Sequence, residues 1–179
     1  QNRATIGGNL ATASGAADLP SILLPLGASV VLESVDGERE MKLERFIRGY
    51  RDADRLPNEV MREIIVPVPA EHSVQKFYKR GSRKALTLSR ISLGLYAEVE
   101  GGVIWEFRAG AGSMSPIPIR LPRLEALLKG KRITAELIDE AAETARNEVS
   151  PRKSAQWRKA MTANLVRRFL EEDISAKDK

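Results

Sequence analysis

A proline-containing break near the middle of the chain most constrains how it can fold. Residues 66–72 read Val-Pro-Val-Pro-Ala-Glu-His. Each proline lacks the N–H that a helix or central strand needs, and it also restricts the residue before it. We therefore expect the 179-residue chain to divide here, into one part over residues 1–70, a second over residues 73–174 and a frayed tail over residues 175–179.

The second part begins with extended segments. Residues 74–80, 88–99 and 103–111 read as three strands in succession. Gly101-Gly102, between the last two, is typical of a tight hairpin turn. These segments predict a small antiparallel sheet of about three strands.

Helices follow the strands. A short helix is expected over residues 121–128, ended by Gly130, and a longer one begins at Thr134. A third is predicted where apolar residues recur at every fourth position in one stripe: Trp157, Met161, Leu165 and Phe169. Strands followed by helices predict an α+β fold, with the helices packed on one face of the sheet.

Shorter elements are expected in the first part. Asp18 is placed to cap a short helix entered at Pro20. Residues 29–33 and 63–66 read as strands, and Leu43 to Tyr50 suits a short helix.

Two adjacent glycines near the start are the main chemical signal. Thr5-Ile6-Gly7-Gly8-Asn9 combines glycines, which accept positive φ at little cost, with two polar side chains. Such a loop can form a nest of inward-facing N–H groups that binds phosphate, with the Asp18 carboxylate free to accept hydroxyl hydrogen bonds. The alternatives are a plain tight turn and a capping role for Asp18. No P-loop or Rossmann fingerprint accompanies the pair.

Composition narrows the possible functions. The chain has no cysteine, so it can hold neither a disulfide nor a cysteine-ligated cluster, and this usage fits the cytoplasm. His72 is the only histidine, which argues against a histidine metal site. No apolar run is long enough to span a membrane.

A net charge of +5 raises nucleic-acid binding as a rival function. Acidic residues interleave with the basic ones, however, and the few aromatic residues are scattered. Single-strand binders instead pair a basic groove with stacking aromatics. The basic residues are therefore interpreted as solvated helix faces.

The sequence resembles the FAD-binding (medium) subunits of molybdenum hydroxylases, the family of xanthine dehydrogenase and carbon monoxide dehydrogenase. The similarity rests on the opening motif through Pro20 and on later landmarks in their usual order, which are Phe46–Arg51, Glu63–Pro67, Phe77–Arg80 and Arg108–Gly112. It covers essentially the whole chain.

The resemblance implies a flavoprotein, with residues 1–70 as the C-terminal part of the FAD-binding subdomain and residues 73–174 as the flavoprotein C-terminal domain. FAD would be the cofactor, and the matching positions are Thr5, Ile6, Gly7, Gly8, Asn9, Asp18, Met61 and Lys79. No side chain is assigned a catalytic role. Electrons would pass from an iron–sulfur subunit through FAD to NAD or another acceptor, while a partner subunit holds the molybdenum cofactor.

Two departures qualify this expectation. The family's N-terminal subdomain, with its first glycine-rich FAD loop, has no counterpart in this sequence, so a truncated subunit is expected to bind FAD weakly or not at all by itself. Gly15 stands where many relatives carry proline. The alternative function is a docking domain, residues 73–174, that binds partner subunits without a flavin.

Overall fold

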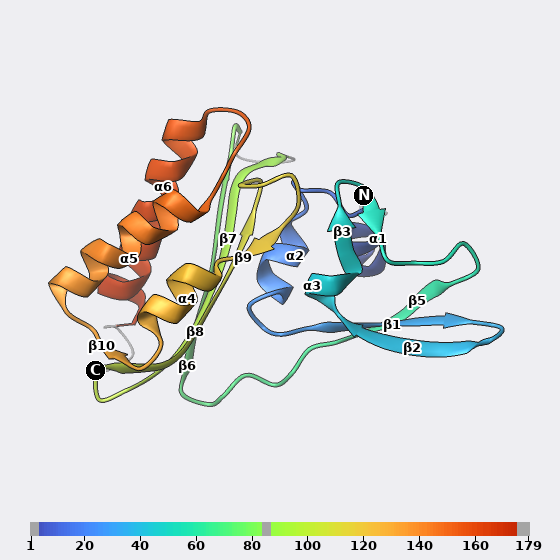
Figure 1. Ribbon diagram of the computed structural model, residues 1–179, viewed down its shortest axis with the longest axis horizontal. Helices are drawn as coiled ribbons and strands as arrows, with labels where there is room; N and C mark the ends of the chain where they lie inside the picture. Colours follow the sequence, from blue (N-terminus) through green and yellow to red (C-terminus); the bar gives the residue numbers. More distant parts are fainter. Residues whose placement is uncertain (1–3, 84–86, 175–179) are drawn as a thin grey trace.

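Two packed halves lie side by side in the computed structural model, which describes residues 4–83 and 87–174 (Figure 1). The expected tail at 175–179 lies outside these residues. The first half contains α1 (Ile6–Ala11), α2 (Asp18–Leu23), β1 (Ser29–Ser34), β2 (Gly37–Lys42), α3 (Leu43–Phe46), β3 (Ile47–Gly49), β4 (Asp52–Ala53) and β5 (Val60–Ile65). The second contains β6 (Ser73–Gly81), β7 (Ser89–Glu100), β8 (Val103–Gly112), β9 (Ile119–Arg120), α4 (Pro122–Leu128), β10 (Lys131–Arg132), α5 (Ala135–Glu148), α6 (Ala155–Arg168) and a π-helical turn (Phe169–Asp173).

The second half is built on the predicted antiparallel sheet. Its strands are ordered β10-β8-β7-β6, and β9 pairs with β8. The β7–β8 hairpin turns at Gly101 and Gly102, whose φ values of 57° and 73° need glycine. The α+β prediction is thus confirmed, with two short edge strands added to the three long ones.

Helices α4, α5 and α6 cover one face of this sheet (Figure 1). Thr134 begins α5 as predicted, since its side chain accepts a hydrogen bond from the Leu137 N–H at 3.2 Å. Apolar residues of the sheet and of these helices form the larger of two cores, among them Leu93, Phe107 and Phe169. The opposite face of the sheet receives α2 from the first half.

The predicted apolar stripe of α6 is only partly buried. Leu165 and Phe169 are buried, but 41% of Trp157 is exposed, so its assignment to the core is wrong. The reason is geometric. Four residues advance a helix about 40° beyond one full turn, so a spacing of four rotates steadily away from the core.

The first half contains a smaller three-stranded sheet, ordered β2-β1-β5, packed against a core that includes Leu10, Val30 and Phe46. The helix predicted over Leu43 to Tyr50 ends at Phe46, and that prediction is wrong beyond it. Residues 47–49 instead form β3, which pairs with β4 around a turn where Arg51 has a φ of 57°. Local helix propensity is overridden there by pairing with a later segment.

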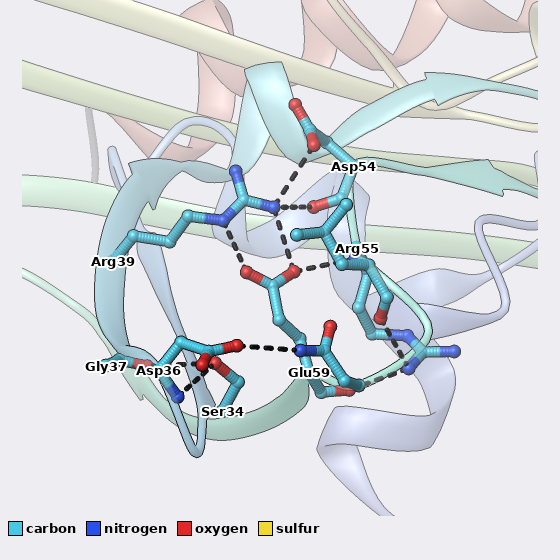
Figure 2. Close-up of polar contacts among 9 residues, drawn as sticks. Ser34, Asp36, Gly37, Arg39, Asp54, Arg55 and Glu59 are labelled. Atoms are coloured by element: carbon cyan, nitrogen blue, oxygen red, sulfur yellow. Dashed lines mark hydrogen bonds and ion pairs between the residues drawn. The ribbon is translucent and has the colours of Figure 1, made fainter.

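An ion-pair network fastens the loop before β5 onto β2 (Figure 2). Arg39 Nε and Nη2 donate to the two Glu59 carboxylate oxygens at 2.6 and 2.9 Å, and Nη2 also reaches Asp54 Oδ1 at 3.2 Å. The Leu56 N–H donates to Glu59 as well, at 2.7 Å. These hydrogen bonds, chiefly those from Arg39, lower the pKa of Glu59 from 4.5 to about 2. Glu59 is buried and three donors of the protein engage its carboxylate, so we assign the network a structural role.

Candidate functional site

The glycine pair lies in a helix rather than in a nest. Gly7 and Gly8 belong to the first turns of α1, and neither has positive φ, so the predicted nest conformation is wrong. Thr5 is the N-cap, and its Oγ1 accepts a hydrogen bond from the Gly8 N–H at 3.0 Å. The start of a helix still presents amide N–H groups to an anion.

Gly7 and Gly8 leave α1 without side chains at two successive positions. A Cβ on Gly8 would lie 3.0 Å from Thr5 Oγ1, and one on Gly7 would lie 3.7 Å from Met61 Sδ. Met61 comes from β5, so the fold brings this predicted residue against the glycine pair. Ile6 is 57% exposed on the same turn. The spaces beside the two glycines are thus taken up by Thr5 and Met61, although Gly8 itself is exposed.

Asn9 carries an unsatisfied polar atom beside this surface. Its Oδ1 is buried and lacks a hydrogen-bond partner within the described ranges 4–83 and 87–174. Buried polar atoms in folded proteins are nearly always paired, so an orphan at this place is expected when a polar ligand completes the site. The unpaired Asn9 Oδ1 beside the exposed Gly8 is compatible with a ligand that donates a hydrogen bond here.

Asp18 and Lys79 meet at the junction of the two halves. Lys79 Nζ on β6 lies 2.6 Å from Asp18 Oδ2 at the start of α2. The predicted capping role of Asp18 is wrong, since Ala17 is the N-cap of α2 and makes no side-chain cap. The carboxylate points instead toward the sheet. About a third of each side chain is exposed, 32% for Asp18 and 35% for Lys79, so the pair remains accessible to a ligand.

Ser89 completes this group and was not foreseen. Its Oγ donates a hydrogen bond to Asp18 Oδ1, and the residue is only 6% exposed. A register shift places Arg80 opposite Ile91 but Gly81 opposite Ser89, so Arg90 bulges out of the strand. Such a bulge reverses the face on which the preceding side chain lies. Sequence alone gives no sign of it, because alternation through residues 88–99 would place Ser89 on the opposite face.

The predicted residues thus gather in two clusters. One contains the α1 start with Met61, and the other contains Asp18, Lys79 and the added Ser89. The loop between α1 and α2 joins the two clusters, and it is bonded to the end of β8, where the Ser113 N–H donates to the Gly15 carbonyl at 2.6 Å.

Other site types find no support where the structure is described. Among residues 4–83 and 87–174, no group of three or more His, Cys, Asp or Glu side chains could hold a metal ion. No helix of the described chain is both long and apolar enough to cross a membrane. Several basic side chains on the surface are paired with carboxylates, including Arg120 with Glu125 and Arg167 with Glu171.

The sequence matches two protein families in succession. Residues 1–69 match the FAD binding domain in molybdopterin dehydrogenase, and residues 76–173 match the CO dehydrogenase flavoprotein C-terminal domain. The fold and site define a flavoprotein domain pair. The chain belongs to the family of FAD-binding medium subunits of molybdenum hydroxylases. FAD is the cofactor of this subunit in the family, whereas the molybdenum and iron–sulfur cofactors belong to other subunits.

Individual relatives agree with this assignment. The chain is 38% identical over 144 residues to the nicotinate dehydrogenase FAD-subunit of Eubacterium barkeri, an alignment that covers 78% of this chain and 48% of that protein. It is 27% identical to the glyceraldehyde dehydrogenase medium chain of Sulfolobus acidocaldarius, over 96% of this chain and 62% of that one. The structure of carbon monoxide dehydrogenase from Hydrogenophaga pseudoflava superposes with a TM-score of 0.91 at 29% identity, covering 98% of this chain and 62% of that one. The chain therefore spans about half to three fifths of the length of these relatives.

Proposed function

We propose that this chain binds FAD and serves as an electron-transfer subunit of a molybdenum hydroxylase such as xanthine dehydrogenase. The observation that carries the proposal is the pair of clusters, one at the α1 start within the first half and one around Asp18 at the junction of the halves. Electrons would arrive from an iron–sulfur subunit and leave for NAD or another acceptor. When bound, FAD supplies the redox chemistry that the side chains of this chain do not provide.

Each predicted residue has a role in this proposal. Thr5 holds the first turn of α1 in place, and Gly7 and Gly8, which add no side chain of their own, would help this turn to hold the pyrophosphate of FAD. Asn9 offers its buried Oδ1 as an acceptor to a ligand hydroxyl.

The side chains outside the glycine turn set orientation. Ile6 and Met61 give apolar contact at the edge of the glycine surface. Asp18 would accept hydroxyl hydrogen bonds, since a carboxylate offers about four acceptor positions and the donors found among the described residues, Lys79 and Ser89, occupy two of them. Lys79 balances the charge of Asp18 and contributes positive potential beside the phosphates.

Titration with FAD tests the cofactor proposal. Backbone amide NMR signals of the unsubstituted chain are followed as FAD is added, because this measurement also detects weak binding. Perturbations are expected at residues 5–9 and around Asp18. Asp18→Asn should weaken binding about tenfold, as it removes a charge-assisted acceptor, while Asp36→Asn on the exposed β1–β2 turn serves as the matched control. Perturbations confined to other surfaces would contradict the proposal.

The partners and the acceptor need a separate experiment. We propose a cytoplasmic hetero-oligomer with the molybdenum and iron–sulfur subunits, supported by the absence of cysteine from this chain. Relatives named for nicotinate, glyceraldehyde and xanthine share this type of subunit, so the substrate is expected to be chosen on another chain. The path of the electrons is tested by assembling the chain with the partner subunits and assaying the complex with NAD and with artificial acceptors. Retention of the molybdenum subunit with no flavin would favour the docking-domain alternative.

A further inference from the structure

Ser89 is held in place from both sides. Its hydroxyl donates to the Asp18 carboxylate, while its carbonyl accepts a hydrogen bond from Ser113 Oγ at 2.8 Å inside the protein. Ser113 is a non-glycine residue with a φ of 64°, a conformation that costs energy and persists only when its surroundings impose it.

These contacts form a closed circuit. The Ser113 N–H donates to the Gly15 carbonyl at 2.6 Å, and Gly15 lies three residues before Asp18 in the same loop. Hydrogen bonds therefore hold the loop between α1 and α2 against the end of the large sheet. They run from Gly15 through Ser113 and Ser89 to Asp18. A Cβ on Gly15 would lie 2.5 Å from the Pro116 carbonyl oxygen, so the loop is tightly seated.

The circuit bears directly on the Asp18 carboxylate. Lys79 Nζ donates to Oδ2 and Ser89 Oγ donates to Oδ1, so each carboxylate oxygen has one donor. With both oxygens engaged the carboxylate plane is fixed, and the remaining lone pairs face outward in one orientation. Pre-set acceptors bind a ligand more tightly, because less freedom is lost on binding.

We propose that Ser89 is a positioning residue of the cofactor site, which orients the Asp18 carboxylate for the hydroxyl groups of the bound flavin nucleotide. This inference rests on the proposed function. It adds a residue that acts through Asp18 rather than by touching the cofactor.

The test is a set of FAD dissociation constants for substituted chains. Ser89→Ala should weaken FAD binding roughly fivefold through loss of a hydrogen bond to a charged group, and Ser89→Thr should restore most of it. Ser92→Ala is the matched control, because Ser92 is also buried on β7 and its hydroxyl has no partner among the residues the structure describes. Thermal unfolding of the FAD-free proteins shows whether any variant has lost its fold.

The deciding measurement is made in an Asp18→Ala background, which, unlike Asp18→Asn, leaves no side-chain oxygen for Ser89 to bond. If Ser89 acts through the carboxylate, Ser89→Ala should weaken binding no further there, since interacting sites are not additive. An equal loss in both backgrounds, or no loss in either, overturns the positioning role while leaving FAD binding intact. Absence of FAD both from the unsubstituted chain and from its assembly with the molybdenum and iron–sulfur subunits overturns the proposed function and this inference with it.

Discussion

At the scale of single residues, Glu59 shows how strongly the fold sets the charge of one group. The residue is 6% exposed and is bonded to Arg39 and to the Leu56 N–H, which lower its pKa to about 2. In the unfolded chain its pKa returns to the ordinary value of 4.5. Between these two values the unfolded state binds more protons than the folded state, so stability rises with pH across this window.

We predict a change in acid sensitivity for Glu59→Gln. The contribution of Glu59 is fully present above its unfolded pKa and is lost as pH falls from about 4.5 toward about 2. The unfolding Tm of the variant should therefore lie furthest below that of the parent above pH 5 and approach it near pH 2. Glu38→Gln, at an exposed ion pair with Arg62, is the control and should show a much smaller difference. A difference that does not change with pH would contradict the prediction.

Single residues also show where prediction from sequence succeeds. Thr134 was predicted to begin a helix because capping depends on neighbours a few positions away. The capping role of Asp18 was predicted wrongly, because its carboxylate bonds to Lys79 and Ser89, which lie 61 and 71 positions along the chain. Gly7 and Gly8 can form either an anion-binding nest or a helical turn. In the structure they are helical, and Thr5 caps the helix.

At the scale of elements, α2 crosses the large sheet over a strip without side chains. Gly94, Gly110 and Gly112 lie on neighbouring strands, and the paired register places Gly94 opposite Gly110. A Cβ on Gly94 would lie 2.2 Å from the Ser21 carbonyl oxygen, and one on Gly110 would lie 2.5 Å from it. The backbone of α2 therefore rests on the backbone of the sheet.

Substitution at this crossing should be costly. Gly94→Ala places its methyl group into the α2 backbone and should lower the free energy of unfolding by about 2 kcal/mol, within the range for overpacked cores. Gly49→Ala is the control, since its Cβ would meet the nearest atom, Asp52 Cβ, at 3.4 Å, an ordinary contact. Urea unfolding monitored by circular dichroism measures both. Equal stability of the two variants would show that α2 shifts freely on the sheet.

Elements differ in how much of them the sequence determines. The three long strands and the β7–β8 hairpin were predicted because period and turn residues are local signals. The two-residue strands β9 and β10 carry too little pattern to be recognised. The packing of α2 against three strand glycines could not be predicted, because a single glycine in a strand indicates only that the strand is locally less stable.

At the scale of the whole molecule, two cores of unequal size share one junction. Among the described residues the larger core holds 23 buried apolar residues and the smaller holds 10. The junction includes α2 on the glycine strip, the Asp18–Lys79 ion pair and the Gly15–Ser113 hydrogen bond. A core of ten residues is marginal on its own, because small apolar cores barely offset chain entropy. The smaller half is therefore expected to depend on the larger one.

This dependence predicts one cooperative unfolding transition for the parent chain. In differential scanning calorimetry the calorimetric and van't Hoff enthalpies should agree, as for a two-state domain. Gly94→Ala should weaken the coupling, so that a lower-temperature transition of the smaller half separates from that of the larger half. The assignment can be checked by tracking amide signals of β1 and β7 during heating. Two resolved transitions in the parent, with β1 melting first, would show instead that the halves are stable independently and that the junction adds little.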